Sequence, residues 1–189
     1  MKRHLYPKKL WVLLFFQIWV SCFSNSGECQ QVKDLPRDPS IAVGTGIFNL
    51  NNPAYGLFGI SYFSEKPLWI FSLFAEGLIT VQTGYYVCLG IYLPIDIGKR
   101  ISLKVGFAPG IYGTGDGYNL GSDLEFKSSA TLSYKFNSNM KLSLQFSHIS
   151  NGGTSPYNPG AEMLGIYYEI PVKARKEKNN QSKLISSNP

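Results

Sequence analysis

Eight segments in which apolar and polar residues alternate constrain the fold of this chain more than any other feature. Successive side chains on a β-strand point to opposite faces, so this alternation predicts strands with one apolar and one polar face. It is clearest in residues 122–136, where leucine and aromatic residues alternate with Asp123, Glu125 and Lys127. None of these segments has the period of a helix. The predicted strands span residues 41–50, 55–63, 68–79, 83–94, 101–112, 122–136, 140–150 and 162–172.

The segments have the length, about ten residues, that a tilted strand needs to cross a bilayer. Charges of both signs recur on the polar faces, which suits pairing inside a narrow lumen, and we expect this network to include Glu76, Lys104, Asp123, Glu125, Lys127 and Lys135. Aromatic residues gather near segment ends, as at membrane interfaces; they are Tyr55, Trp69, Tyr85, Tyr112, Tyr134 and Tyr167. We therefore predict an all-β fold, an eight-stranded antiparallel transmembrane β-barrel over residues 41–172. The alternation does not say which face is inside, so a soluble sandwich or lipocalin-like barrel stays open.

The two ends of the chain have a different composition from this body. Residues 1–29 have the layout of a signal peptide, with basic residues followed by an apolar run from Leu10 to Val20 and then small or polar residues. We expect a lead over residues 30–40 and a disordered basic tail over residues 173–189. The net charge of +6 comes from these ends, because residues 33–172 hold nine basic and ten acidic residues. The near-neutral body therefore gives no reason to expect a nucleic-acid partner.

The lengths of the connections predict how the barrel is oriented. The connections after the second, fourth and sixth segments are short, at residues 64–67, 96–100 and 137–139. The longest connections, residues 113–121 and 151–161, fall at the opposite end. Outer membrane barrels have short periplasmic turns and longer external loops. We therefore expect the end near residues 148–162 to lie in the outer leaflet, which in a Gram-negative cell contains lipopolysaccharide.

The candidate chemistry lies at that end. His148 and Ser150 are two residues apart on one strand, so both share the apolar, lipid-facing side, and Glu162 shares the same side of the next strand. A serine becomes a nucleophile when a base removes its proton and an acid orients that base. We predict Ser150 as nucleophile, His148 as general base and Glu162 as orienting acid, with Glu162 opposite Ser150 and therefore diagonal to His148.

Acyl transfer also needs hydrogen-bond donors for the oxyanion. Asn151, Gly153 and Asn158 surround the serine in the sequence. We favour the Gly153 N–H and the Asn158 side chain, with the Asn151 N–H as a substitute. The three cysteines form no metal-binding pattern or disulfide framework, and we expect no metal or other cofactor.

These residues carry a resemblance to a known family. His148-Ile-Ser150-Asn151 followed by Glu162 resembles the His-x-Ser-Asn signature, with a glutamate twelve residues past the serine, of the outer-membrane lipid A 3-O-deacylase (PagL-type) family. The resemblance implies an outer membrane serine esterase that removes the ester-linked 3-hydroxyacyl chain at position 3 of lipid A. It implies lipid A or lipopolysaccharide as substrate, outer membrane lipids as surroundings and no metal.

Two alternatives stay open at this point. An outer membrane phospholipase A-like hydrolase also has His-x-Ser on a lipid-facing strand, but that enzyme resembles a twelve-stranded, calcium-dependent barrel with asparagine as third member. A small structural or adhesion barrel without enzymatic activity is the other. The sequence does not distinguish a monomer from a homodimer.

Overall fold

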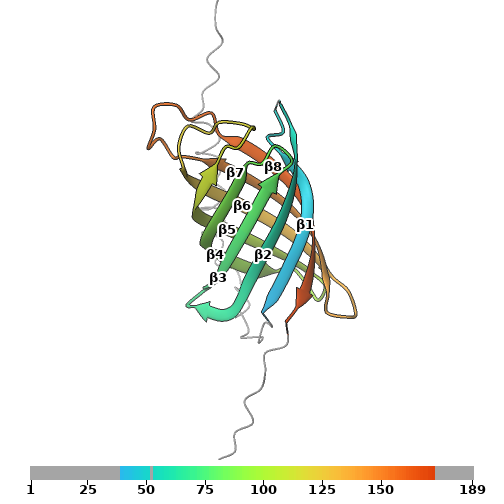
Figure 1. Ribbon diagram of the computed structural model, residues 1–189. Coiled ribbons are helices and arrows are strands. Elements are labelled where there is room, and N and C mark those ends of the chain that lie inside the picture. Colours follow the sequence, from blue (N-terminus) through green and yellow to red (C-terminus); the bar gives the residue numbers. More distant parts are fainter. Residues whose placement is uncertain (1–38, 52, 173–189) are drawn as a thin grey trace, which may run out of the picture. The chain divides into compact units, whose positions relative to one another are not determined.

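The structure is a computed structural model that describes residues 39–51 and 53–172; the predicted signal peptide and basic tail lie outside this part. It contains one closed barrel in which each strand pairs antiparallel with the next and β8 pairs with β1 (Figure 1). The strands are β1 (Ser40–Phe48), β2 (Tyr55–Leu68), β3 (Phe71–Thr80), β4 (Tyr85–Asp96), β5 (Ile101–Gly113), β6 (Leu124–Lys135), β7 (Lys141–Ser150) and β8 (Ala161–Pro171). The predicted all-β fold and eight-stranded antiparallel barrel are confirmed. In the described residues, no helix has the length and apolar character needed to span a membrane.

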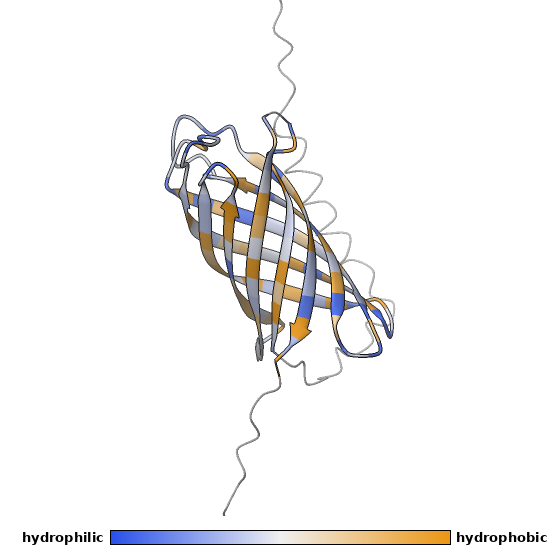
Figure 2. Cartoon of the chain, turned by 45° about the vertical axis from the view of Figure 1, so that its right-hand side comes forward, coloured by the Kyte–Doolittle hydropathy of each residue, from blue (hydrophilic) through white to orange (hydrophobic). Residues whose placement is uncertain are grey.

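The outer face of the barrel wall is apolar, whereas the interior holds both polar and apolar residues. On β7, Leu142, Leu144 and Phe146 are exposed on the outside, while the residues between them are buried inside. Apolar and polar residues alternate along the strands, as Figure 2 shows. Exposing this apolar outer surface to water would cost about 25 cal/mol for each Å². The barrel interior, in contrast, holds most of the buried polar residues. The wall is thus built to face hydrocarbon, and the soluble alternative, with its charged face outside, is wrong.

Ion pairs satisfy the buried charges of the interior at two places. Glu76 on β3 pairs with Lys127 on β6, and Gln145 accepts a hydrogen bond from the same ammonium group at 3.0 Å. Glu169 on β8 pairs with Lys104 at 2.5 Å and with Lys141 at 2.8 Å. Because charges buried in protein need partners, these pairs let strands far apart in the sequence share one polar core.

Part of the predicted interior network was wrong. Asp123 and Lys135 are exposed, because they lie at or beyond the two ends of β6, where a side chain of inward parity reaches water. Two aromatic residues also differ from the prediction: Tyr112 and Tyr167 are buried in the core rather than placed at the membrane interface. Their positions near strand ends suggested an interface, but strand parity directs their rings inward.

Close approach between β1 and β8 closes the barrel. Gly44 on β1 lies against Tyr167, and a Cβ added to Gly44 would be 2.3 Å from the backbone oxygen of Ile166. Such a distance is too short for any side chain, so glycine allows the two strands to pair here.

The β2–β3 turn also differs from the sequence prediction. Residues 64–67 were expected to form the connection, but β2 continues through them to Leu68, with a register shift between Phe63 and Pro67. Proline lacks an N–H and is tolerated at such bulges. The chain turns instead at Trp69 and Ile70, where Trp69 has a φ of 63° and is 84% exposed.

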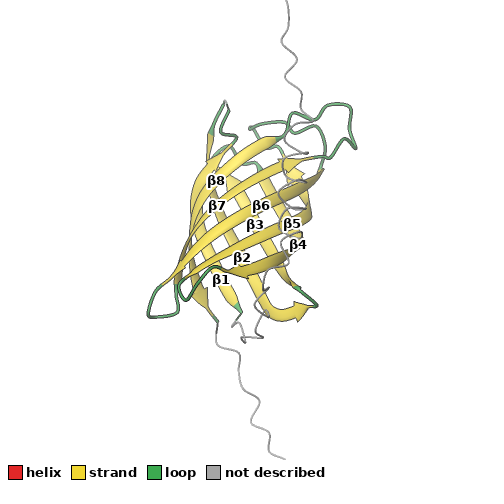
Figure 3. Ribbon diagram, turned by 180° about the vertical axis from the view of Figure 1, so that it is seen from behind, coloured by secondary structure: helices red, strands yellow, loops and turns green. Residues whose placement is uncertain are grey.

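The two ends of the barrel carry different connections. The turns after β2, β4 and β6 are short, whereas the connections 114–123 and 151–160 are the longest and lie at the other end (Figure 3). Strand β7 runs from the short-turn end to the long-connection end, so His148 and Ser150 are near the long connections.

Candidate active site

His148 and Ser150 lie on the last three residues of β7, on the outer wall. Their parity matches that of the exposed Leu144 and Phe146, while Ile149 between them is fully buried. The His148 side chain is 45% exposed, and Ser150 is half-buried. The two side chains therefore open towards the membrane side of the wall, as the prediction of a transmembrane barrel requires.

Glu162 on β8 lies directly across from His148. The two residues are partners in the antiparallel ladder, and Glu162 Oε1 is 3.3 Å from His148 Nδ1. The predicted pairing of Glu162 with Ser150 was wrong by two residues. The observed direct pairing brings the Glu162 carboxylate closer to the His148 imidazole than the predicted diagonal arrangement would, because directly opposed side chains are closer than diagonal ones.

A second partner of Glu162 comes from the far end of the sequence. Asn51, in the connection between β1 and β2, donates a hydrogen bond of 2.6 Å from its Nδ2 atom to Glu162 Oε2. The backbone N–H of Leu50 also donates to the Glu162 carbonyl oxygen at 3.1 Å. The glutamate is thus held from two sides, by His148 at one oxygen and by Asn51 at the other. Asn51 was not predicted as a site residue from the sequence, although closing an eight-stranded barrel brings the end of β1 next to β8.

Gly160 makes room for the imidazole ring. Continuing the β7–β8 register past Ile149 and Ala161 puts Gly160 across from Ser150. A Cβ at Gly160 would lie 2.8 Å from His148 Cε1 and 3.3 Å from Nε2, and its φ is +66°. The ring therefore extends from Glu162 at its Nδ1 atom towards the Ser150–Gly160 position at its Nε2 atom. No hydrogen bond joins Ser150 to His148 in the described part of the chain; in enzymes without substrate such bonds are often long.

The predicted oxyanion donors belong to a loop held by its own hydrogen bonds. The Gly153 N–H donates to Asn151 Oδ1 at 2.9 Å, and the Asn151 N–H donates to Asn158 Oδ1 at 3.2 Å. Both backbone groups are therefore engaged within the loop. The Nδ2 atom of Asn158 has no hydrogen-bond partner among the residues described. Of the three predicted oxyanion donors, this side-chain amide is therefore the one that is free to bind an oxyanion.

The loop 151–160 packs against the connection 114–123. Asn151, which is fully buried, donates from Nδ2 to the carbonyl oxygens of Tyr157 at 2.9 Å and of Leu120 at 3.4 Å. Nearby, burial raises the pKa of Tyr118, and the charge that Tyr157 and Glu162 can carry raises it further, so this phenol stays neutral at physiological pH. The contacts fix the position of the loop beside Ser150. Within residues 39–51 and 53–172, no cluster of three or more His, Cys, Asp or Glu side chains could hold a metal ion.

Comparison with known proteins identifies the family to which this chain belongs. A family model described as lipid A 3-O-deacylase (PagL) matches residues 51–171, from Asn51 through the end of β8. The chain belongs to the lipid A 3-O-deacylase family. This match confirms the resemblance inferred from the His-x-Ser-Asn motif, and PagL-family proteins act on lipid A in the outer membrane.

Solved structures support the fold independently. The crystal structure of the outer membrane enzyme PagL is similar to this chain, with a TM-score of 0.56 and 20% identity over 70% of this chain and 99% of that one. A de novo designed transmembrane β-barrel matches with a TM-score of 0.51 and 11% identity over 73% of this chain and 98% of that one. The designed barrel TMB2.3 matches with a TM-score of 0.50 and 14% identity over 76% and 100%. No curated protein gives a significant match to the sequence. This PagL-family chain is an outer membrane β-barrel.

Proposed function

We propose that this chain removes the ester-linked 3-hydroxyacyl chain at position 3 of lipid A, with Ser150 as nucleophile, His148 as general base and Glu162 as the acid that orients it. The observation that carries the proposal is the 3.3 Å contact between His148 Nδ1 and Glu162 Oε1 on the outer wall. A carboxylate at Nδ1 holds the proton on that nitrogen and leaves the Nε2 lone pair to accept the serine proton. The direction of the ring, from Glu162 towards the Ser150 position, supports this order.

The reaction follows from these roles. Ser150 Oγ attacks the ester carbonyl carbon while its proton passes to His148 Nε2, giving a tetrahedral oxyanion. We assign the Asn158 Nδ2 amide as an oxyanion donor, while the Gly153 and Asn151 N–H groups hold the loop that positions it. The oxyanion collapses, the sugar oxygen leaves with the proton from His148, and water then hydrolyses the acyl-serine to release the 3-hydroxy fatty acid.

We further propose that the long-connection end lies in the outer leaflet. Short turns after β2, β4 and β6 and long connections at the other end are the arrangement of outer membrane barrels. Lipid A occupies the outer leaflet, so this orientation brings the ester to the outward-facing His148 and Ser150 without the substrate entering the barrel.

Expression of the chain in a Gram-negative host tests the proposal. Mass spectrometry of extracted lipid A is expected to show loss of one 3-hydroxyacyl chain, and Ser150→Ala or His148→Ala is expected to abolish the loss. Ser147→Ala, on the interior face of the same strand, is the matched control for a serine change. Unaltered lipid A from cells with folded protein in the outer membrane would refute the proposal, and lysophospholipid as product would favour a phospholipase A-like activity instead.

A further inference from the structure

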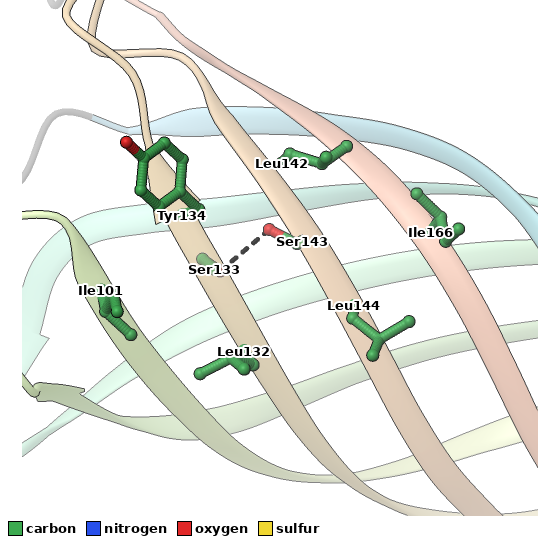
Figure 4. A pocket seen from close by; sticks show the side chains of 8 residues that line it. All are labelled: Ile101, Leu132, Ser133, Tyr134, Leu142, Ser143, Leu144 and Ile166. Atoms are coloured by element: carbon green, nitrogen blue, oxygen red, sulfur yellow. Dashed lines mark hydrogen bonds between the residues drawn. The ribbon is translucent and has the colours of Figure 1, made fainter.

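We propose that the outer wall binds one glycerophospholipid in the leaflet opposite His148, with an acyl chain in an apolar hollow and the phosphate on Arg100. This site is separate from the proposed esterase site. It consists of a hollow of about 250 Å³ across β5, β6, β7 and β8 and a cation at its end. The eight residues that line the hollow are Ile101, Leu132, Ser133, Tyr134, Leu142, Ser143, Leu144 and Ile166 (Figure 4).

The floor of the hollow follows from the β6–β7 register. Leu132 pairs with Leu144 and Tyr134 pairs with Leu142, so two rows of outward side chains border a strip where Ser133 and Ser143 face inward. These two serines are buried and joined by a hydrogen bond of 2.8 Å. The strip between the rows therefore has no outward side chain and is hollowed.

Arg100 gives the hollow a polar end. In Figure 4, Tyr134 stands at one end of the hollow with its hydroxyl group directed away from the leucines. That hydroxyl accepts a hydrogen bond of 3.1 Å from Arg100 Nη1, and Asn137 Oδ1 accepts one of 2.9 Å from Nη2. A guanidinium has five N–H donors, and the other three have no partner among the described residues. They are free to bind a phosphate in the bidentate manner that arginine favours.

The charges around Arg100 suit an anion. Lys99 precedes it in the β4–β5 turn, and Lys135 pairs with it through a backbone hydrogen bond of 2.7 Å; both lysines are exposed. Asp96 is the one acid in or directly beside the two turns, 97–100 and 136–140. The long connections at the other end contain aspartates and no lysine or arginine. Cations thus gather next to the apolar hollow, and this combination fits a lipid with a phosphate head group.

The polar end of the hollow lies away from the proposed esterase site. Ser150 is six positions after Leu144 on β7, roughly 20 Å along the strand at about 3.3 Å per residue. Arg100 and Tyr134 lie at the short-turn end, further still from Ser150. The occupant is therefore a lipid of the other leaflet, which in an outer membrane is glycerophospholipid.

Native mass spectrometry of the full chain tests this site. The protein is extracted in a mild detergent after reconstitution with equal phosphatidylglycerol and phosphatidylethanolamine, and retained lipid is counted for each barrel. One phospholipid is expected on the unmodified chain. Arg100→Gln removes the cation, and Leu144→Trp fills the hollow. Each is expected to lower the fraction of barrels that retain a lipid about tenfold, because each removes either the charge-assisted contact to the phosphate or the apolar surface that holds the acyl chain.

Two matched variants control for unspecific effects. Asp116→Asn removes an exposed charge in the connection 114–123 at the other end of the barrel, and Leu89→Trp enlarges an outward residue on β4 that is 64% exposed. Both are expected to retain lipid as the unmodified chain does, and all variants are checked for a folded barrel by heat-dependent mobility on a gel. Equal retention in all five proteins overturns the site, as does a second copy of the chain or a lipid A species in place of the phospholipid. Deacylation does not enter this measurement, so either result leaves the proposed function to its own test.

Discussion

Gly160→Ala tests whether the position of the His148 ring sets the rate. The added Cβ would lie 2.8 Å from His148 Cε1, about 0.6 Å inside the 3.4 Å at which ordinary contacts begin. The ring must shift by a similar amount, because the rest of the residue is fixed in the β7 strand. A displacement of about 1 Å in a catalytic group costs roughly 100-fold in rate. We therefore expect the deacylation rate to fall about 10- to 100-fold, which corresponds to an increase of about 1.4–2.7 kcal/mol in the activation free energy of deacylation.

Gly152→Ala is the matched control for this change. Its φ of +64° is close to the +66° of Gly160, so both variants carry a similar left-handed backbone penalty of about 1–2 kcal/mol. At Gly152 the new Cβ would meet only the Phe126 ring, at 3.4 Å. Initial rates of 3-hydroxy fatty acid release from lipid A are measured with purified protein in detergent, and unfolding is followed in urea. Equal rates in the two variants, at equal stability, would refute the reasoning.

Three further changes test other parts of the structure. Asn51→Ala removes the 2.6 Å hydrogen bond to the orienting glutamate and is expected to slow deacylation about tenfold with little effect on urea unfolding; an unchanged rate argues against a role for this side chain. Glu76→Leu leaves the Lys127 charge buried and is expected to lower the free energy of unfolding by about 3–5 kcal/mol, and adding Lys127→Met should restore most of it in the same titration. Gly44→Ala is expected to prevent closure of the barrel and to abolish heat-dependent mobility, whereas Gly77→Ala, whose nearest contact would be 3.8 Å, should fold normally.

The sequence predicts the face of each site residue better than its partners. Alternation puts His148 and Ser150 on the apolar face of their strand, because parity does not depend on how strands pair, and the prediction of a transmembrane barrel puts that face on the outer wall. It does not fix the register, since a shift by two residues leaves every side chain on the same face. Glu162 was therefore placed on the correct side but opposite the wrong residue. The ten-residue connection 151–160 sets the register, and its internal hydrogen bonds through Asn151 are not visible in a pattern of apolar residues.

Two other differences also come from how the strands pair, which the local sequence does not show. Residues 64–67 have the composition of a turn, yet the strand passes through them because a bulge accommodates the change of register. Asn51 lies 111 residues from Glu162, and nothing near Asn51 in the sequence indicates a site. Barrel closure brings the two together, so the topology predicts their contact and the local sequence does not.

The filled interior of this barrel has a consequence for the cell that makes it. Paired charges and aromatic rings from all around the wall occupy the space that larger barrels leave open for water. The protein should therefore conduct no measurable ionic current in a planar bilayer. A barrel of this kind can be abundant in the cell envelope without admitting antibiotics or bile salts. The proposed site lies on its outer wall, and its filled interior has only a structural role.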